Sequence, residues 1–174
     1  MYVHELTPTE YSTFYSPYVQ SVSDEYNLVE ELEISLHRFI KFVQNIPLDK
    51  FDYRYAAGKW IIKEIIQHLM DAERIFAYRA LRFARNDQTE LPGFDENAFA
   101  LHTNPRAAVR KLPDLLTEYT LIRQSSIALF NTFTDEELKR GGIAAEAFIS
   151  VRAIGFVLIG HQNHHQRIFQ ERYL

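Results

Sequence analysis

Hydrophobic residues recur at helical spacing along most of this chain, and no stretch of any length alternates in the manner of a β-strand. The clearest helical stripe lies in residues 24–46 and follows a 3-4-3-4-3 spacing. It consists of Val29, Leu32, Leu36, Phe39, Val43 and Ile46. Charged residues such as Glu30, Arg38 and Lys41 fall on the other side of the same segment. This pattern is typical of a bundle helix with one buried face.

Three further segments carry the same periodicity, at residues 60–85, 109–133 and 150–171. Ser150 is a suitable N-cap for the last of them. Pro113 is tolerated only in or near a first turn, so the continuous part of the third helix can begin there. Four amphipathic helices of this length predict an all-α fold, a bundle of four antiparallel helices.

Two segments lie outside the predicted helices. Residues 1–22 are rich in tyrosine and read as an irregular N-terminal arm, with one short helix at about 8–15, that packs against the body. Residues 86–104 are polar and read as a long loop between the second and third helices, which is often a functional or site-covering feature. We therefore interpret residues 1–174 as one domain, in which residues 23–174 form the bundle.

The composition excludes several classes of partner. Nineteen basic and twenty-three acidic residues give a net charge of −4, without a run of lysine or arginine, so no nucleic-acid partner is expected. No stretch approaches the ~20 apolar residues of a membrane span, and the N-terminal residues do not resemble a signal peptide. A cytoplasmic protein without a membrane partner is the expectation.

The chain contains no cysteine. This excludes disulfides, thiolate metal ligands and a nucleophilic thiol supplied by the protein. No serine occurs in a recognisable nucleophile elbow either, so no catalytic residue can be assigned from the sequence.

Two histidines, His161 and His165, lie four residues apart in the last predicted helix. Four residues is just over one turn, so both rings project from one face. The same face carries Ile154, Val157, Leu158 and Ile168. Two stacked imidazoles on an apolar face are costly to bury unless something binds them, and a divalent metal ion is the simplest candidate. A histidine in such a place is more commonly a hydrogen-bonded core residue, and the neighbouring His164 shows that the segment is histidine-rich.

A third inward-facing histidine occurs in the second predicted helix. His68 lies on the apolar stripe of that helix, together with Ile61, Ile65, Ala72 and Ile75. Two helices that direct histidines into one small core favour a metal site formed by His68, His161 and His165. The other histidines, His4 and His37 among them, are not expected to take part, and the same holds for His102.

Three imidazoles leave a coordination position open, as in catalytic zinc sites. Zinc fits this donor set best, while nickel and iron(II) are alternatives because imidazole suits all three metals. Each ligand should donate its second ring N–H to an acceptor. The candidates for that role are Asp71, Glu73, Gln162 and Asn163, with Asp71 the first choice because it follows His68 by three residues.

Several short motifs support this interpretation through their order and spacing. They are Gly58-Lys59-Trp60, Glu64, His68-Leu69-Met70-Asp71-Ala72-Glu73, Leu91-Pro92-Gly93-Phe94-Asp95-Glu96, Gly160-His161, His164-His165 and Glu171-Arg172-Tyr173-Leu174. From about residue 11 to the C-terminus, the chain resembles the DinB-like superfamily of four-helix bundles. In many relatives a Ser or Thr after the tryptophan caps the second helix, whereas Ile61 stands there in this chain. Glu64 therefore lacks its usual partner, which puts the start of that helix in question.

The resemblance implies that His68, His161 and His165 bind a metal and that His164 does not. The superfamily includes metal-dependent hydrolases and the bacillithiol and mycothiol S-transferases. It therefore implies transfer of a small-molecule thiol to an electrophile, with hydrolysis by metal-activated water as the nearest alternative. A non-catalytic, stress-related metal-binding dimer is the third reading. Self-association is common among such relatives, and the high aromatic content, 14%, also favours a homodimer.

Overall fold

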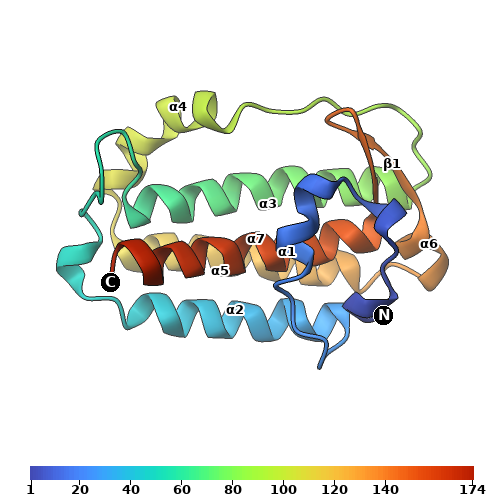
Figure 1. Ribbon diagram of the computed structural model, residues 1–174, viewed down its shortest axis with the longest axis horizontal. Coiled ribbons are helices and arrows are strands. Elements are labelled where there is room, and N and C mark those ends of the chain that lie inside the picture. Colours follow the sequence, from blue (N-terminus) through green and yellow to red (C-terminus); the bar gives the residue numbers. More distant parts are fainter.

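Four long helices form the body of the protein, as the computed structural model of residues 1–174 shows (Figure 1). They are α2 (Leu28–Gln44), α3 (Ile62–Ala84), α5 (Leu112–Phe130) and α7 (Val151–Arg172). Each lies within a few residues of its predicted segment, so the all-α four-helix bundle is confirmed.

The helix starts follow from local chemistry. The Asn27 side chain accepts hydrogen bonds from the first turn of α2, and Ser150 Oγ accepts one from the backbone N–H of Ala153 in α7. At the start of α3, Ile61 offers no capping oxygen. Glu64 nevertheless accepts a hydrogen bond from the Ile61 backbone N–H at 2.7 Å and pairs with Arg54 through both carboxylate oxygens. Glu64 thus keeps its own half of a capping box, and Arg54 holds the Glu64 carboxylate in place.

The direction of the helices corrects one prediction, because they are not all antiparallel. Helices α3 and α5 run one way and α2 and α7 run the other (Figure 1), while the packed pairs are α2/α5, α2/α7, α3/α5 and α3/α7. The reason is the connection between α3 and α5, which carries the chain back along the bundle before α5 begins. Consecutive helices α2 and α3 consequently do not form one of the main packed pairs.

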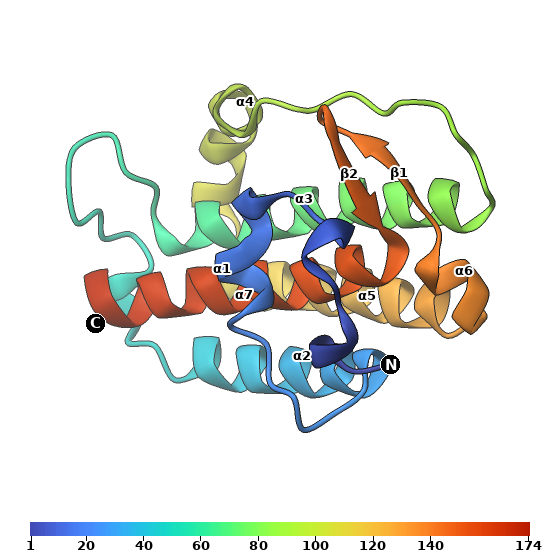
Figure 2. The same cartoon turned by 45° about the vertical axis from the view of Figure 1, so that its right-hand side comes forward.

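That connection contains a helix that the sequence did not predict. Its second part is α4 (Glu96–Val109), which packs on α3 (Figure 2). Asp95 caps α4 by accepting hydrogen bonds from the backbone N–H groups of Asn97 and Ala98. Only Ala100 and Ala107 are buried, so α4 has no apolar stripe by which to recognise it, and its Pro105 resembles a helix breaker.

A short hairpin also escaped prediction. Strands β1 (Gly141–Ala144) and β2 (Ala147–Ser150) pair antiparallel and follow the short helix α6 (Asp135–Lys139). The turn residues Ala145 and Glu146 have φ angles of 52° and 65°. Such two-residue turns are usually marked by Asn-Gly or a similar pair, and this sequence carries no such signal.

The N-terminal arm crosses α7 (Figures 1 and 2). Its elements are η1 (Val3–Glu5), η2 (Pro8–Glu10), η3 (Thr13–Tyr15) and α1 (Ser16–Val19), and a further short turn, η4 (Leu48–Lys50), follows α2. Glu10 binds Arg152 at 2.5 and 2.6 Å and accepts a hydrogen bond from Ser150 at 2.8 Å. At Gly160 the backbone of Tyr18 approaches so closely that an added Cβ would lie 2.2 Å from its carbonyl oxygen. Gly160 therefore permits this contact.

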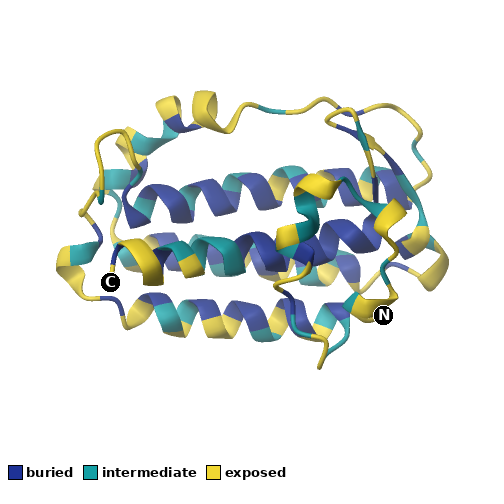
Figure 3. Cartoon of the chain, viewed as in Figure 1, coloured by how far each residue is buried: buried dark blue, intermediate teal, exposed yellow.

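Buried residues line the inward faces of the long helices (Figure 3). They form two apolar clusters, one toward each end of the bundle. Along α7 the first cluster ends at Ile159 and the second resumes at Phe169. The predicted metal ligands His161 and His165 fall between the two. None of the helices is long and apolar enough to cross a membrane.

Candidate metal centre

Three histidine rings from two helices converge between α3 and α7. Their ligand atoms all lie within 4.8 Å of one another. His161 Nε2 is 3.1 Å from His68 Nε2 and 3.1 Å from His165 Nε2. The two-helix arrangement expected from the sequence is therefore present, and the Nε2 atoms face one another.

Hydrogen bonding alone does not account for this convergence. A neutral imidazole nitrogen is either a donor with one hydrogen or an acceptor with one in-plane lone pair. His161 Nε2 faces two other Nε2 atoms at the same distance, so it can make one good bond at most. A cation placed among the three nitrogens would satisfy all three lone pairs. Around a tetrahedral zinc ion with bonds of about 2.0–2.1 Å, ligand nitrogens lie about 3.3–3.4 Å apart, close to the two spacings of 3.1 Å at His161 Nε2.

Burial keeps all three rings neutral. It lowers the pKa of His68 to about 4, with a smaller contribution from His164. Burial also lowers the pKa of His161 and His165 well below the usual value, and in each case another histidine of the cluster adds to the effect. Metal ligation requires unprotonated imidazole, so the three residues are in the state that binds a divalent cation.

The remaining histidines lie outside the cluster. His4 pairs with Asp24 at 2.6 Å on the surface, and His37 and His102 are exposed. His164 is not among the grouped ligand atoms, although its ring centroid lies 5.0 Å from that of His165 and 5.3 Å from that of Tyr18. The structure thus brings together the three predicted residues and no other histidine.

The predicted outer partners of these histidines are wrong. Asp71 accepts a hydrogen bond from Gln67, and Asn163 donates to the Ser21 carbonyl. Each of the four candidates is already hydrogen-bonded to another group, and none is hydrogen-bonded to a cluster histidine. His165 Nδ1 is buried without a partner. The prediction failed because residues three apart on a helix share a face but need not reach the same ring atom.

Two of those candidates instead belong to a buried network beside the cluster. Glu73 accepts a hydrogen bond from Arg123 Nε at 2.8 Å, and Arg123 also contacts the Tyr119 hydroxyl at 3.3 Å. Tyr119 in turn donates to Gln162 Oε1 at 2.7 Å, and Gln162 donates to the Ser35 carbonyl at 3.0 Å. The network joins all four long helices and fixes α7 one residue away from His161.

Two cavities of more than 200 Å³ reach the cluster from different sides, besides a crevice of about 10 Å³ at His68. One of about 250 Å³ is bounded by the N-terminal arm, α3, the loop before α4 and the hairpin, and it reaches His161. The other, of about 220 Å³, is bounded by residues 55–60 and the end of α7, and it reaches His165. The first residues of α4 contribute to both walls, through Glu96 and Asn97 respectively. The long connection predicted from the sequence therefore does border the site.

The sequence did not single out the side chains that shape these cavities. Tyr18 comes from the arm and lies against His161, with ring centroids 5.5 Å apart. Arg79 comes from α3, eleven residues or about three turns beyond His68, and lines the first cavity. Both residues reach the site only through tertiary packing, and the sequence signal for them was limited to the density of tyrosines in the arm.

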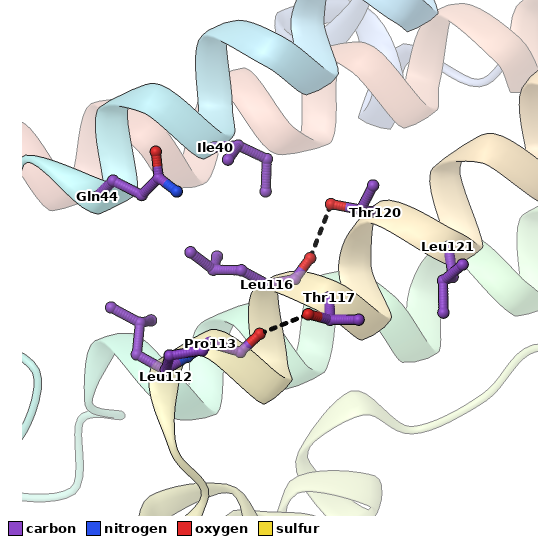
Figure 4. Close-up of a pocket in the computed structure, with 8 residues that line it drawn as sticks. All are labelled: Ile40, Gln44, Leu112, Pro113, Leu116, Thr117, Thr120 and Leu121. Atoms are coloured by element: carbon purple, nitrogen blue, oxygen red, sulfur yellow. Dashed lines mark hydrogen bonds between the residues drawn. The ribbon is translucent and has the colours of Figure 1, made fainter.

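A third hollow is unrelated to the cluster. It lies between α2 and α5, has a volume of about 470 Å³ and shares no lining residue with the two cavities above (Figure 4). Thr117 and Thr120 donate hydrogen bonds to the helix carbonyls of Pro113 and Leu116, so they offer no free hydroxyl hydrogen to a ligand.

The fold and the cluster define a helical-bundle protein with three neutral histidines suited to a divalent metal. Residues 31–169 match the DinB superfamily, and the chain belongs to that superfamily. YfiT from Bacillus subtilis, a solved structure described as a probable metal-dependent hydrolase with an unusual four-helix bundle topology, has the same fold. Its TM-score is 0.70 at 20% identity, over 83% of this chain and 82% of that one. No curated protein matches the chain.

Proposed function

We propose that His68, His161 and His165 bind one divalent metal ion and that the protein is a metal-dependent enzyme acting on a small molecule. The observation that carries the proposal is the convergence of three Nε2 atoms, from two buried histidines and the half-buried His165, with two of these atoms 3.1 Å from the third. Three nitrogen ligands suit zinc best, with nickel and iron(II) as alternatives. A metal held in this way lowers the pKa of a bound water or thiol and polarises a carbonyl.

Thiol transfer is the reaction that we propose first. Such a reaction has two organic substrates, a small-molecule thiol and an electrophile, and two separate cavities meet the cluster at His161 and His165. The chain contains no cysteine, so the thiol has to come from a substrate. The aromatic walls of the first cavity, which include Tyr18 and Phe94, suit an apolar group beside His161.

Hydrolysis is the second candidate, because the similar YfiT is described as a probable metal-dependent hydrolase. It needs one organic substrate and a water molecule. In both reactions the role of this chain is the same, since it supplies three neutral nitrogen ligands and a partly enclosed cavity. The nucleophile distinguishes the two.

Metal binding is tested first, by titrating the metal-free protein with zinc in a calorimeter. One zinc per chain is expected for the wild type. His161→Ala should weaken binding by more than the about 10–100-fold that loss of an outer-shell partner causes. His102→Ala, an exposed histidine on α4, is the matched control and should bind like the wild type. Equal binding by both variants would exclude the proposed ligand set.

The reaction is then tested with zinc-loaded protein. Bacillithiol, mycothiol and glutathione are each offered with a chlorinated aromatic or an epoxide, and ester and amide hydrolysis is measured in parallel. Thiol-dependent product that disappears in His161→Ala supports transfer, and thiol-independent hydrolysis that disappears in the same variant supports the hydrolase. Zinc binding without any His161-dependent turnover would leave a non-catalytic metal-binding protein.

A further inference from the structure

One buried arginine in this protein lacks an acidic partner. Three arginines are buried, and two of them form ion pairs: Arg123 with Glu73 at 2.8 Å, and Arg152 with Glu10 at 2.5 Å. Arg79 is only 3% exposed, yet it belongs to no ion pair. A buried charge is unfavourable unless it is paired or well hydrogen-bonded. The exception therefore requires an explanation.

The surroundings of Arg79 hold its guanidinium in place without neutralising it. Arg79 Nη2 donates a hydrogen bond to the Pro92 carbonyl at 2.8 Å. The guanidinium carbon lies 5.5 Å from the ring centre of Phe76 and 5.9 Å from that of Phe94. The Tyr15 hydroxyl is a second hydrogen-bond partner of the guanidinium. Because an arginine has five N–H donors, these two bonds still leave donors free for a planar anion.

The same arginine lines the cavity that reaches the histidine cluster. Arg79 and His161 both border the space of about 250 Å³, and aromatic rings, including those of Tyr15, Tyr18 and Phe94, form much of its remaining wall. Glu96 is the one acidic residue in the lining. It is exposed and forms no ion pair with Arg79. The cavity thus offers a cation on one wall, a histidine on another and apolar surface between them.

We propose that Arg79 binds the carboxylate of a small substrate whose apolar part lies among the aromatic rings and whose reacting group lies near His161. The proposal rests on the proposed function, because it places the substrate beside the proposed metal ligands. It names a substrate class, a small carboxylate, and a residue that selects for it. Arginine suits this role because its planar fork matches the two oxygens of a carboxylate.

The test compares two probes of nearly equal shape, benzoate and the neutral benzamide, by following protein NMR shifts during titration. Zinc-free wild-type protein is used first, so that the anion cannot bind to a metal. We expect benzoate to bind about tenfold more tightly than benzamide or better, since a charge-assisted bond contributes at least that much. Arg79→Met keeps the bulk and removes the charge, and it should abolish the preference. Arg79→Lys keeps the charge without the planar fork and should retain part of it.

Two further measurements separate this proposal from the metal proposal. Zinc titration of Arg79→Met should match the wild type, which also shows that the variant is folded. Zinc-free His161→Ala should still prefer benzoate, although it no longer binds zinc tightly. If the wild type shows no preference for benzoate, or if the preference survives in Arg79→Met, the role assigned to Arg79 is wrong. A preference that requires zinc and His161 but not Arg79 would place the anion on the metal and overturn the proposal as well. If the protein does not bind zinc but its preference for benzoate still depends on Arg79, only the proposed metal site is rejected.

Discussion

Replacing Gly160 by alanine should detach or displace the N-terminal arm. The added Cβ would lie 2.2 Å from the carbonyl oxygen of Tyr18 and 2.4 Å from its carbonyl carbon. These are backbone atoms, so no side-chain rotation relieves the overlap, and α1 has to move by about 1 Å or more to restore ordinary contact distances. Because the ring of Tyr18 lies against His161, the displacement should also disturb the wall of the site.

The magnitude follows from two opposing terms. Overpacking typically costs about 1–3 kcal/mol, and contact with rigid backbone places this case at the upper end. Alanine in a helix interior regains about 1 kcal/mol relative to glycine. We therefore expect the free energy of unfolding to fall by about 2 kcal/mol, which in a domain of this size lowers the melting temperature by about 4–8 °C.

Urea unfolding and limited proteolysis measure these effects. The matched control is Gly155→Ala, the same change on the same helix, whose Cβ would meet the ends of the Leu28 side chain and the Phe130 ring at 2.8–2.9 Å. Those groups can adjust, so the loss of stability should be smaller, and the arm should stay resistant to protease. If Gly160→Ala is as stable as the wild type with an equally protected arm, then the close packing of α1 on α7 is wrong.

Four further outcomes are expected. Glu73→Ala should lower the free energy of unfolding, measured in urea, by about 3–5 kcal/mol, because it leaves the buried Arg123 unpaired. The control Arg74→Ala, at the adjacent residue, breaks a surface pair that contributes at most about 1 kcal/mol, so similar losses in the two variants would contradict the network. Burial would raise the pKa of Glu10, but hydrogen bonds from Arg152, the Thr7 backbone and Ser150 lower it from 4.5 to about 2. After solvent screening, about 1–3 kcal/mol of stability, fully present above pH 4.5, should be lost as the pH falls toward 2, and Glu10→Gln should flatten that dependence in acid-unfolding curves. Glu146→Gly should raise the melting temperature, by relieving up to about 1–2 kcal/mol of left-handed strain, and an unchanged value would count against this turn geometry. Sedimentation should give a mass near twice 20.5 kDa for the expected homodimer, and a mass near 20.5 kDa at micromolar concentration would reject it.

The features that the sequence predicted are those that depend on spacing along one helix. The stripe that includes Leu36 and Phe39 located α2, and the His161–His165 spacing placed two rings on one face of α7. His68 could be added because it occupied a stripe position on a second helix. These inferences need only the helical repeat, which is a local property of the chain.

The features that it did not predict depend on contacts between distant segments. Helix α4 is stabilised by its Asp95 cap and by its own small residues Ala100 and Ala107, which are buried where it packs against α3. Its sequence therefore shows no apolar stripe. The parallel course of α3 and α5 follows from the path of that connection, which hydrophobic periodicity does not encode. The position of Tyr18 beside His161 depends on the glycine that admits α1, and a lone glycine within a helical pattern has many possible explanations.

Two unfavourably buried groups, the histidine cluster and Arg79, border the same cavity. The histidine cluster sets three neutral nitrogens face to face, although hydrogen bonds between them cannot satisfy all three. Arg79 keeps a charge buried without an acidic partner, although Arg123 and Arg152 show that this chain pairs its other buried arginines. Neither arrangement stabilises the fold by itself, and each would be completed by a ligand of opposite character, a cation for the nitrogens and an anion for the guanidinium. Because unfavourable groups in a native structure concentrate where binding compensates them, their convergence on one space is the strongest argument that this cavity is the functional site.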